Sequence, residues 1–194
     1  MRERLFLMAA MAAALPFYAH AASGDWKKDA VQYDRRRIER LDHAWTEALG
    51  EARAGGHARE LAAQGALFKP GAALKRPEPA PGTYRCRTFK LGGNLPYVAY
   101  GWFTCRVELT PGGDMLLRKT TGSQRQAGSL YPDGPRRQVF LGAVAWGSDK
   151  PLAYRQDVER DQAGVLERIG ANRWRLALPY PKQELKLDVI ELRK

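Results

Sequence analysis

The sequence predicts an α+β protein, in which an N-terminal helical segment packs on an antiparallel β-meander. Apolar residues recur at helical spacing between residues 29 and 54, and short β-forming segments follow from Thr83 onward. Each of these segments is bounded by glycine, proline, asparagine or aspartate, which are the residues of turns. No helical segment long enough for a parallel crossover lies between them, so we expect neighbouring strands to be antiparallel.

The first residues have the organisation of a secretory signal peptide. Two arginines precede an apolar run from Leu5 to Ala14, and Ala19-His20-Ala21 has the small residues of a cleavage site. The run is shorter than the roughly 20 apolar residues that a transmembrane helix needs. Residues 1–21 are therefore expected to be a signal peptide that is cleaved near Ala21, and the mature protein is expected to be soluble and periplasmic, with no transmembrane segment.

Residues 22–74 are expected to form the helical segment. Its apolar stripe consists of Ile38, Leu41, Trp45, Ala48, Leu49 and Ala52. Asp29 and Gln32 have the spacing of a capping box, and Gly55-Gly56 is a natural helix end. A proline-rich connector at residues 75–82 is expected to be extended, and it leads into a β-domain of residues 83–194.

The β-domain contains eight strand candidates at near-regular spacing. They are residues 83–91, 97–109, 115–121, 126–131, 138–146, 165–169, 173–178 and 185–192. A closed or nearly closed barrel would remove the exposed edges of such a sheet. By strand count and order, the expected barrel is similar to the eight-stranded lipocalin-like (calycin-like) barrels, and a barrel of this size has room for a small ligand cavity.

The two cysteines, Cys86 and Cys105, are expected to form a disulfide, because an exported protein folds in an oxidising compartment. If they lie directly opposite each other on an antiparallel pair, Arg85 faces Arg106 across the other side of the sheet. Like charges in such positions are unfavourable unless they are compensated.

That outer face would collect Arg85, Arg87 and Arg106 beside Trp102. Two interpretations remain open at this point. The cluster is a surface that binds an anionic ligand, or it is a structural ion-pair network that nearby acids such as Glu108 neutralise.

The glycine-rich stretch around Ser123 raises the question of catalysis. Ser123 does not lie in a Gly-x-Ser-x-Gly motif, and the two histidines of the mature chain lie in the helical region. A phosphate-binding loop would have to open a helix, whereas this stretch leads into a strand. We therefore expect a corner between two strands, which binds anions through the side chains of Lys119 and Arg125 if it binds them at all.

Metal ligands are also poorly represented. Asp157, Glu159 and Asp161 are spaced like the start of a calcium loop, but Gln162 stands where the loop needs glycine, and Arg168 where it needs an acid. No paired carboxylates of a glycosidase are recognisable. The sequence therefore predicts no catalytic residue, no metal and no cofactor, and it favours a protein that is not an enzyme.

The formal net charge is +11 at pH 7, and most of the excess lies in residues 82–194. For an exported protein this indicates an anionic ligand or envelope component as partner rather than nucleic acid. The alternative is that the charge serves solubility.

Several segments match a known family in order and spacing. They include "PGTYRCRTFKLG", "YVAYGWFTCRV", "KTTGSQRQAGSLYPD", "RRQVFLGA" and "RDQAGVLERIGANRWRLALPYP". The chain resembles, over nearly its whole mature length, the uncharacterised exported bacterial family catalogued as domain of unknown function 4893. The resemblance implies export, the Cys86–Cys105 pair and an important segment at residues 122–133. The family has no established activity, so the resemblance implies no catalytic residues.

The function expected from the sequence is that of a monomeric, non-enzymatic periplasmic binding module for an amphipathic or anionic ligand. The alternative is an envelope protein that docks a protein or polymer on a basic sheet face, and an uncharacterised hydrolase is the third class. The candidate ligand-binding residues are Arg85, Arg87, Trp102, Arg106, Lys119, Ser123, Gln124, Arg125 and Tyr131.

Overall fold

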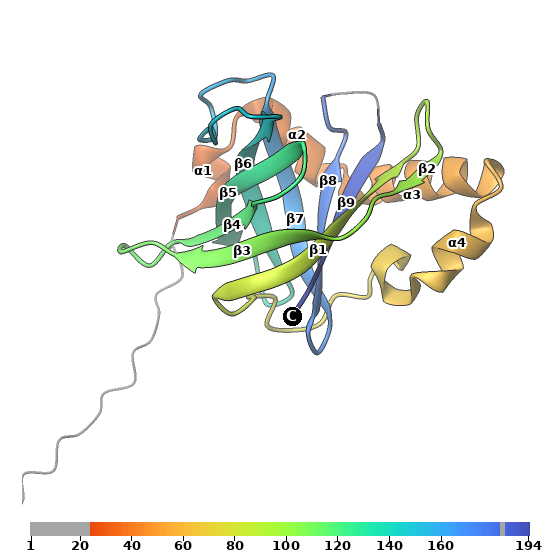
Figure 1. The fold of residues 1–194 in the computed structure, drawn as a ribbon, viewed down its shortest axis with the longest axis horizontal. Coiled ribbons are helices and arrows are strands. Elements are labelled where there is room, and N and C mark those ends of the chain that lie inside the picture. Colours follow the sequence, from red (N-terminus) through yellow and green to blue (C-terminus); the bar gives the residue numbers. More distant parts are fainter. Residues whose placement is uncertain (1–23, 183–184) are drawn as a thin grey trace, which may run out of the picture.

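The computed structural model describes residues 24–182 and 185–194, and within them the chain forms an antiparallel barrel with helices on one side (Figure 1). The signal peptide predicted at residues 1–21 lies outside the described residues. The helices are α1 (Trp26–Asp29), α2 (Gln32–Glu39), α3 (Leu41–Ala54), α4 (Ala58–Ala63) and the short 3₁₀ helix η1 (Gly65–Phe68). The strands are β1 (Gly82–Leu91), β2 (Tyr97–Ala99), β3 (Phe103–Leu109), β4 (Met115–Lys119), β5 (Gln124–Pro132), β6 (Arg137–Trp146), β7 (Asp161–Gly170), β8 (Arg173–Pro179) and β9 (Leu187–Arg193).

The barrel is closed. From β3 to β9 each strand pairs antiparallel with the next, and β1 pairs with both β3 and β9, so that eight strands form a ring. Closure leaves no unpaired edge in the ring. The predicted α+β fold, with an eight-stranded antiparallel barrel and an N-terminal helical segment, is confirmed.

The strand predicted at residues 97–109 is divided in two. β2 pairs with the C-terminal end of β1, where Phe89 is opposite Ala99, whereas β3 pairs with the N-terminal half of β1. The chain leaves the ladder between them, at residues 100–102. The strand β1 therefore changes partner along one side while β9 follows it on the other.

The expected register around the disulfide was wrong by two residues. Tyr84 lies opposite Cys105, and Cys86 lies opposite Phe103, so Arg85 faces Thr104 and not Arg106. The Cys86–Cys105 disulfide is present, with a Cα–Cα distance of 5.8 Å. It joins diagonal neighbours, which also lie within reach of a disulfide, and for this reason the bond does not fix which residues are directly opposite.

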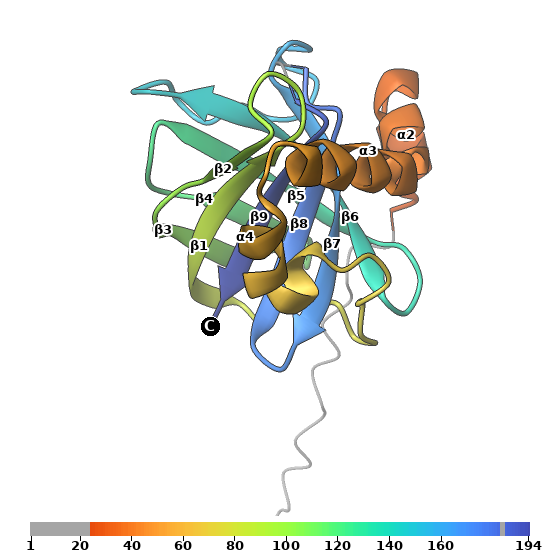
Figure 2. The same ribbon diagram turned by 90° about the vertical axis from the view of Figure 1, so that its right-hand side faces the viewer.

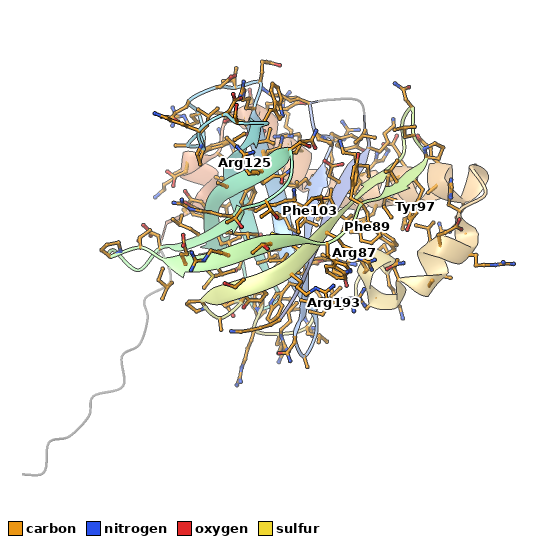
Figure 3. All side chains as sticks on the ribbon, in the orientation of Figure 1. Arg87, Phe89, Tyr97, Phe103, Arg125 and Arg193 are labelled. Atoms are coloured by element: carbon orange, nitrogen blue, oxygen red, sulfur yellow. A yellow bond between two sulfur atoms is a disulfide. The ribbon has the colours of Figure 1, made fainter. Side chains whose placement is uncertain are left out.

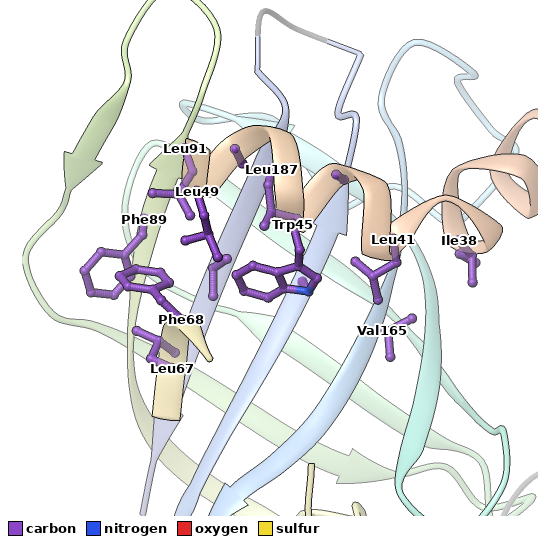
Figure 4. Close-up of a cluster of buried hydrophobic side chains, with 14 of the residues drawn as sticks. Ile38, Leu41, Trp45, Leu49, Leu67, Phe68, Phe89, Leu91, Val165 and Leu187 are labelled. Carbon is purple, nitrogen blue, oxygen red and sulfur yellow. The ribbon is translucent and has the colours of Figure 1, made fainter. Parts of the chain in front are cut away.

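The helices cover one outer wall of the barrel. Figure 2 shows α3 lying across the strands, and Figure 4 shows Trp45 and Leu49 of α3 with Phe89, Leu91 and Leu187. All five side chains are buried in one cluster. The helical stripe read from the sequence therefore faces the wall made by β1 and β9, where outward-facing apolar residues need a cover.

The start of the helical segment differs from the prediction. Residues 29–54 form parts of three helices, and the Asp29–Gln32 capping box does not form. α1 begins after Asp25, whose side chain caps it. α2 begins after Val31, whose backbone N–H donates to the hydroxyl of Tyr154 at 3.0 Å. A residue distant in the sequence thus replaces the local cap, which no local pattern could indicate.

The interior of the barrel has two different halves. One half is occupied by apolar side chains and the disulfide: Tyr84, Cys86, Cys105, Val107, Met115, Leu117, Leu130, Phe140, Leu166, Trp174, Leu176, Leu178, Ile190 and Leu192. Inward positions toward the other end carry lysine, glutamine and aspartate. The room that the barrel leaves for a ligand lies at this polar end, which is at the top of Figure 1.

Candidate ligand-binding site

The polar end of the barrel narrows to a small cavity, which we call the throat. Its inward-facing polar residues are Lys90 of β1, Gln124 and Gln126 of β5, Gln162 of β7 and Asp188 of β9. Each occupies an inward position because side chains alternate along a strand, and each points to the same side of the sheet as the inward apolar residues of its own strand. The cavity volume is about 30 Å³, which is enough for about one or two water-sized groups.

Two acceptor atoms of the throat are buried and without a partner. Asp188 and Gln126 are only 6% and 5% exposed, and Asp188 Oδ1 and Gln126 Oε1 make no hydrogen bond with any described residue. Lys90 is the register neighbour of Asp188 on β1, yet the two do not form an ion pair within the described chain. An unpaired buried acceptor is costly, so these two atoms identify a place where a donor is expected.

The carboxyl of Asp188 is strongly affected by its surroundings. Burial raises the pKa of Asp188 to about 6, and the charge of Lys90 offsets only part of that effect. A carboxylate in this position is therefore poorly stabilised by the protein itself, and a bound cationic donor would stabilise it.

A larger cavity, which we call the vestibule, opens above the throat. It has a volume of about 530 Å³, and its described lining is Lys90, Asn94, Leu95, Tyr100, Gln124, Lys182 and Leu185. Lys90, Gln124 and Lys182 also line the throat, so the two cavities adjoin. Volumes of this order are typical of small-molecule sites.

A side chamber of about 100 Å³ lies next to the vestibule, where Tyr100 and Gln124 line both. Lys119 also lines this chamber, but its ammonium group is already occupied. It donates to the carbonyl oxygens of Thr121 and Gln124 at 2.9 and 2.7 Å, and it lies 3.9 Å from the ring centroid of Phe103. Burial, with a smaller contribution from Arg125, lowers the pKa of Lys119 to about 8. Lys119 therefore holds the β4–β5 turn.

The glycine-rich stretch is a strand corner. Gly122 has φ +91°, and a Cβ there would lie 2.7 Å from Lys119 Nζ and 2.9 Å from the Phe103 ring, so both conformation and space require glycine. The guanidinium of Arg125 donates to the carbonyl oxygens of Gly122, Gly147 and Asp149. Arg125 thus joins the β4–β5 turn to the β6–β7 loop through both of its Nη atoms. Figure 3 labels Arg125 near the upper end of the barrel.

The other residues expected to bind ligand are dispersed by the fold. Ser123 and Gln124 line the side chamber, so they and Lys119 are brought together. Arg106 lies outside, near Glu108, and Tyr131 lies on the outer wall against Gly24.

Arg85 and Arg87 stack on Trp102 on the outer wall, each with its guanidinium carbon 4.7 Å from the ring centroid. These three residues form a second group. It is separate from the mouth of the barrel, the name we use for the throat, the vestibule and the side chamber together.

Of the inward-facing polar residues of the throat, sequence reasoning identified Gln124 and missed the others. In "LDVIEL", Asp188 has the same parity as Ile190 and Leu192, which are core residues. A charged residue at an inward position of an otherwise apolar strand is the signal that would have identified it. Gln126 has the same parity as Leu130 and could have been found in the same way.

No group of three or more histidine, cysteine, aspartate or glutamate side chains among the described residues is placed to hold a metal ion. No described helix has both the length and the apolar character needed to cross a membrane.

The fold and the site define a closed antiparallel barrel with a half-apolar interior, a polar mouth and a helical cover on one wall. Comparison with protein families finds a match over residues 26–192 to the family described as Domain of unknown function (DUF4893). The chain belongs to this family, as its sequence resemblance indicated. No curated protein and no solved structure matches the chain.

Proposed function

We propose that this protein is a non-enzymatic binding barrel whose mouth holds a small zwitterionic molecule. In this proposal the ammonium group of the ligand enters the throat, and its anionic group stays in the vestibule. The observation that carries the proposal is the pair of buried acceptors, Asp188 Oδ1 and Gln126 Oε1, that have no partner among the described residues.

The throat suits an ammonium group in size and in chemistry. Its volume of about 30 Å³ accepts a group of the size of water but not a bulky one. An ammonium group has three donors and a positive charge, so it would satisfy both acceptors and neutralise Asp188.

The vestibule suits an anion. Lysine side chains are the charged groups of its described lining, which contains no acid. Lys182 is already paired with Glu159 at 3.6 Å, whereas Lys90 has no ion pair within the described residues. Lys90 is therefore the expected partner of the anionic group, as a point charge above the throat.

The non-enzymatic part of the proposal is supported by the positions of the histidines. His43 Nδ1 lies 2.6 Å from the hydroxyl of Tyr180, and His57 Nδ1 lies 3.4 Å from a carboxylate oxygen of Glu60. Both belong to the helical segment, and neither lines the throat, the vestibule or the side chamber with Ser123. Ser123 thus has no described histidine base, the commonest partner of a serine nucleophile, and the ammonium group of Lys119 in the same chamber already donates to two carbonyl oxygens.

Titration calorimetry with 4-aminobutyrate, butylamine and butyrate tests the proposal. We expect 4-aminobutyrate to bind at least about tenfold more tightly than either single-charge analogue, because only it engages the throat and Lys90 together. Gln126→Leu is expected to weaken its binding about tenfold. Equal affinities for all three probes, or no binding of any of them, would contradict a zwitterionic ligand.

Gln138→Leu is the matched control for that experiment. Gln138 is also buried in the interior and also lacks a partner for its amide, but it lies at the far end of β6 and does not line the throat. We expect Gln138→Leu to bind the probe as the unchanged protein does. An equal loss in both variants would indicate a general effect of the substitution on the barrel.

We also propose that the protein is exported and works in the periplasm. The proposal is supported by the signal-peptide organisation of residues 1–21 and by the buried Cys86–Cys105 disulfide, which suits an oxidising compartment. Intact mass spectrometry of protein isolated from a periplasmic fraction is expected to give a chain that begins at Ala22 and lacks two hydrogens because of the disulfide. A chain retaining residues 1–21 in the cytoplasmic fraction would contradict export.

A further inference from the structure

A group of arginines surrounds one buried carboxylate on the outer wall of the barrel, away from the mouth. Glu191 of β9 is fully buried, and its carboxylate contacts the Nε atoms of Arg87 at 2.8 Å, of Arg173 at 2.6 Å and of Arg193 at 2.6 Å. Burial opposes ionisation of Glu191, but the hydrogen bonds from Arg87 and Arg193 and the charge of Arg173 outweigh it and hold its pKa below the usual value. The single negative charge of Glu191 is therefore shared by three arginines.

A fourth arginine increases the excess. Arg85 of β1 lies directly opposite Arg193 of β9, which lies directly opposite Arg173 of β8. Like charges in these positions repel each other. Arg85 makes no ion pair with a described residue, so four guanidinium groups and one carboxylate leave a local surplus of positive charge.

Trp102 organises the exposed part of this cluster. The guanidinium carbons of Arg85, Arg87 and Arg193 lie 4.7, 4.7 and 5.4 Å from its ring centroid. Figure 3 shows Arg87 and Arg193 close together on the wall of β1 and β9. Stacking on an indole fixes the planes of the guanidinium groups and leaves their edges free to donate.

The sequence left two hypotheses open for this surface, an anion-binding site and a structural ion-pair network. The contacts support each of them for a different part of the cluster. Arg87 and Arg173 are mostly buried and belong to a structural ion-pair network, in which Gln64 also takes part. Arg85 is exposed, and the side chain of Arg193 is 46% exposed. The network does not neutralise these two outer arginines.

We propose that Arg85 and Arg193, held on Trp102, form a binding site for a phosphoryl group on the outer wall of the barrel. A dianionic phosphoryl group would compensate the two outer arginines, and its three terminal oxygens can accept from both guanidinium edges at once. A single carboxylate would compensate only one of them. The site is independent of the mouth and of the function proposed for it.

Binding of two probes tests this site and distinguishes the sources of the group. Glycerol 3-phosphate, measured by titration calorimetry, represents a soluble phosphate ester. Phosphatidylcholine vesicles with and without phosphatidic acid, measured by co-sedimentation, represent a lipid headgroup. The double variant Arg85→Gln, Arg193→Gln is expected to weaken binding of at least one probe at least about tenfold, and the loss is expected to shrink as salt is added.

Arg118→Gln is the matched control, because Arg118 of β4 is also an outward arginine with a side chain 45% exposed, and it lies near Glu108. It is expected to leave binding of both probes unchanged. Loss with the soluble ester assigns a soluble ligand, and loss with vesicles alone assigns a lipid headgroup. Absence of binding to both probes, or an equal loss in Arg118→Gln, would overturn the proposal.

The stability of the double variant gives an independent readout. Without phosphate, the double variant loses both the repulsion between opposite arginines and the ion pair of Arg193 with Glu191, so its melting temperature in buffer serves only as the reference for the measurement with phosphate. With phosphate, the unchanged protein is expected to gain thermal stability and the variant is not. A variant that gains as much from phosphate as the unchanged protein does would contradict the site.

Discussion

Replacing Asp188 with asparagine is expected to raise the free energy of unfolding at pH 8 by about 3 kcal/mol. The pKa of Asp188 is raised from 3.8 to about 6 by burial, and each pKa unit corresponds to about 1.4 kcal/mol. Above pH 6 the folded protein must keep a poorly stabilised carboxylate in the throat, whereas the unfolded chain hydrates it. Asparagine fills the same space without the charge.

The sign of the pH dependence follows from the same shift. Between about pH 4 and pH 6 the folded protein holds a proton on Asp188 that the unfolded chain has already lost, so the contribution of Asp188 to stability falls as the pH rises through this window. The advantage of Asp188→Asn should therefore be small at pH 4, grow up to pH 6 and stay constant above it. Urea unfolding of both proteins at several pH values, followed by tryptophan fluorescence, measures this difference.

Asp42→Asn is the control for that series. It removes an exposed carboxyl from the first turn of α3 and changes the net charge equally. If it stabilises the protein as much as Asp188→Asn does, the effect reflects net charge and not burial. If Asp188→Asn destabilises the protein at pH 8, the carboxylate already has a partner that compensates its burial.

The same variant connects stability with binding. A residue that lowers stability and lines a cavity is expected where a function requires it. Asp188→Asn should therefore bind 4-aminobutyrate more weakly than the unchanged protein does. For the unchanged protein, affinity is expected to rise as the pH increases through 6, because the ionised carboxylate is the better partner for an ammonium group.

The sequence was sufficient to predict the barrel because its signals are local. Turn residues recur between short β-forming segments, and the apolar stripe from Ile38 to Ala52 identifies the helix that covers the wall. Each of these inferences needs only neighbours in the chain.

The candidate sites could not be predicted in the same way, because closure of the barrel creates them. Glu191 is opposite Arg87 only because β9 returns to β1. The expected partner of Arg85 was wrong because a diagonal disulfide leaves the register open. Arg125 was expected to bind an anion, but its guanidinium donates to carbonyl oxygens of a loop more than 20 residues away in the sequence.

Loss of Arg175 is expected to cost the protein about 3–5 kcal/mol, the range for breaking a buried ion pair. Arg175 of β8 is 1% exposed, and its Nε donates to Glu167 at 2.7 Å. Its Nη1 donates to the carbonyl oxygens of Ala66, Leu67 and Lys69 at 3.1, 3.0 and 2.9 Å. The guanidinium carbon lies 4.8 Å from the ring centroid of Trp45 on α3. One side chain thus attaches α3, η1 and the residue after η1 to the barrel.

Arg175→Met keeps the volume and removes every one of these donors. Three carbonyl oxygens and a carboxylate then lose this donor, which is the source of the expected cost. The carbonyl oxygens of Ala66 and Lys69 keep only the backbone hydrogen bonds that they accept from Lys69 and Ala72. Urea unfolding measures the loss, and limited proteolysis should cut the chain near residues 64–69 faster than in the unchanged protein. Adding Glu167→Leu should recover part of the stability, because it removes the carboxylate left without its partner.

Arg173→Met is the matched control, since Arg173 lies two residues away on the same face of β8 and is more exposed. Its partner Glu191 keeps Arg87 and Arg193, so the cost should be smaller, on the order of 1 kcal/mol. Equal losses in the two variants would show that any outward arginine of β8 matters equally. A cost below about 1 kcal/mol for Arg175→Met would mean that the apolar contacts of α3 alone hold the cover. The difference between the two variants therefore separates the polar attachment of the cover from its packing, and it does so without any ligand.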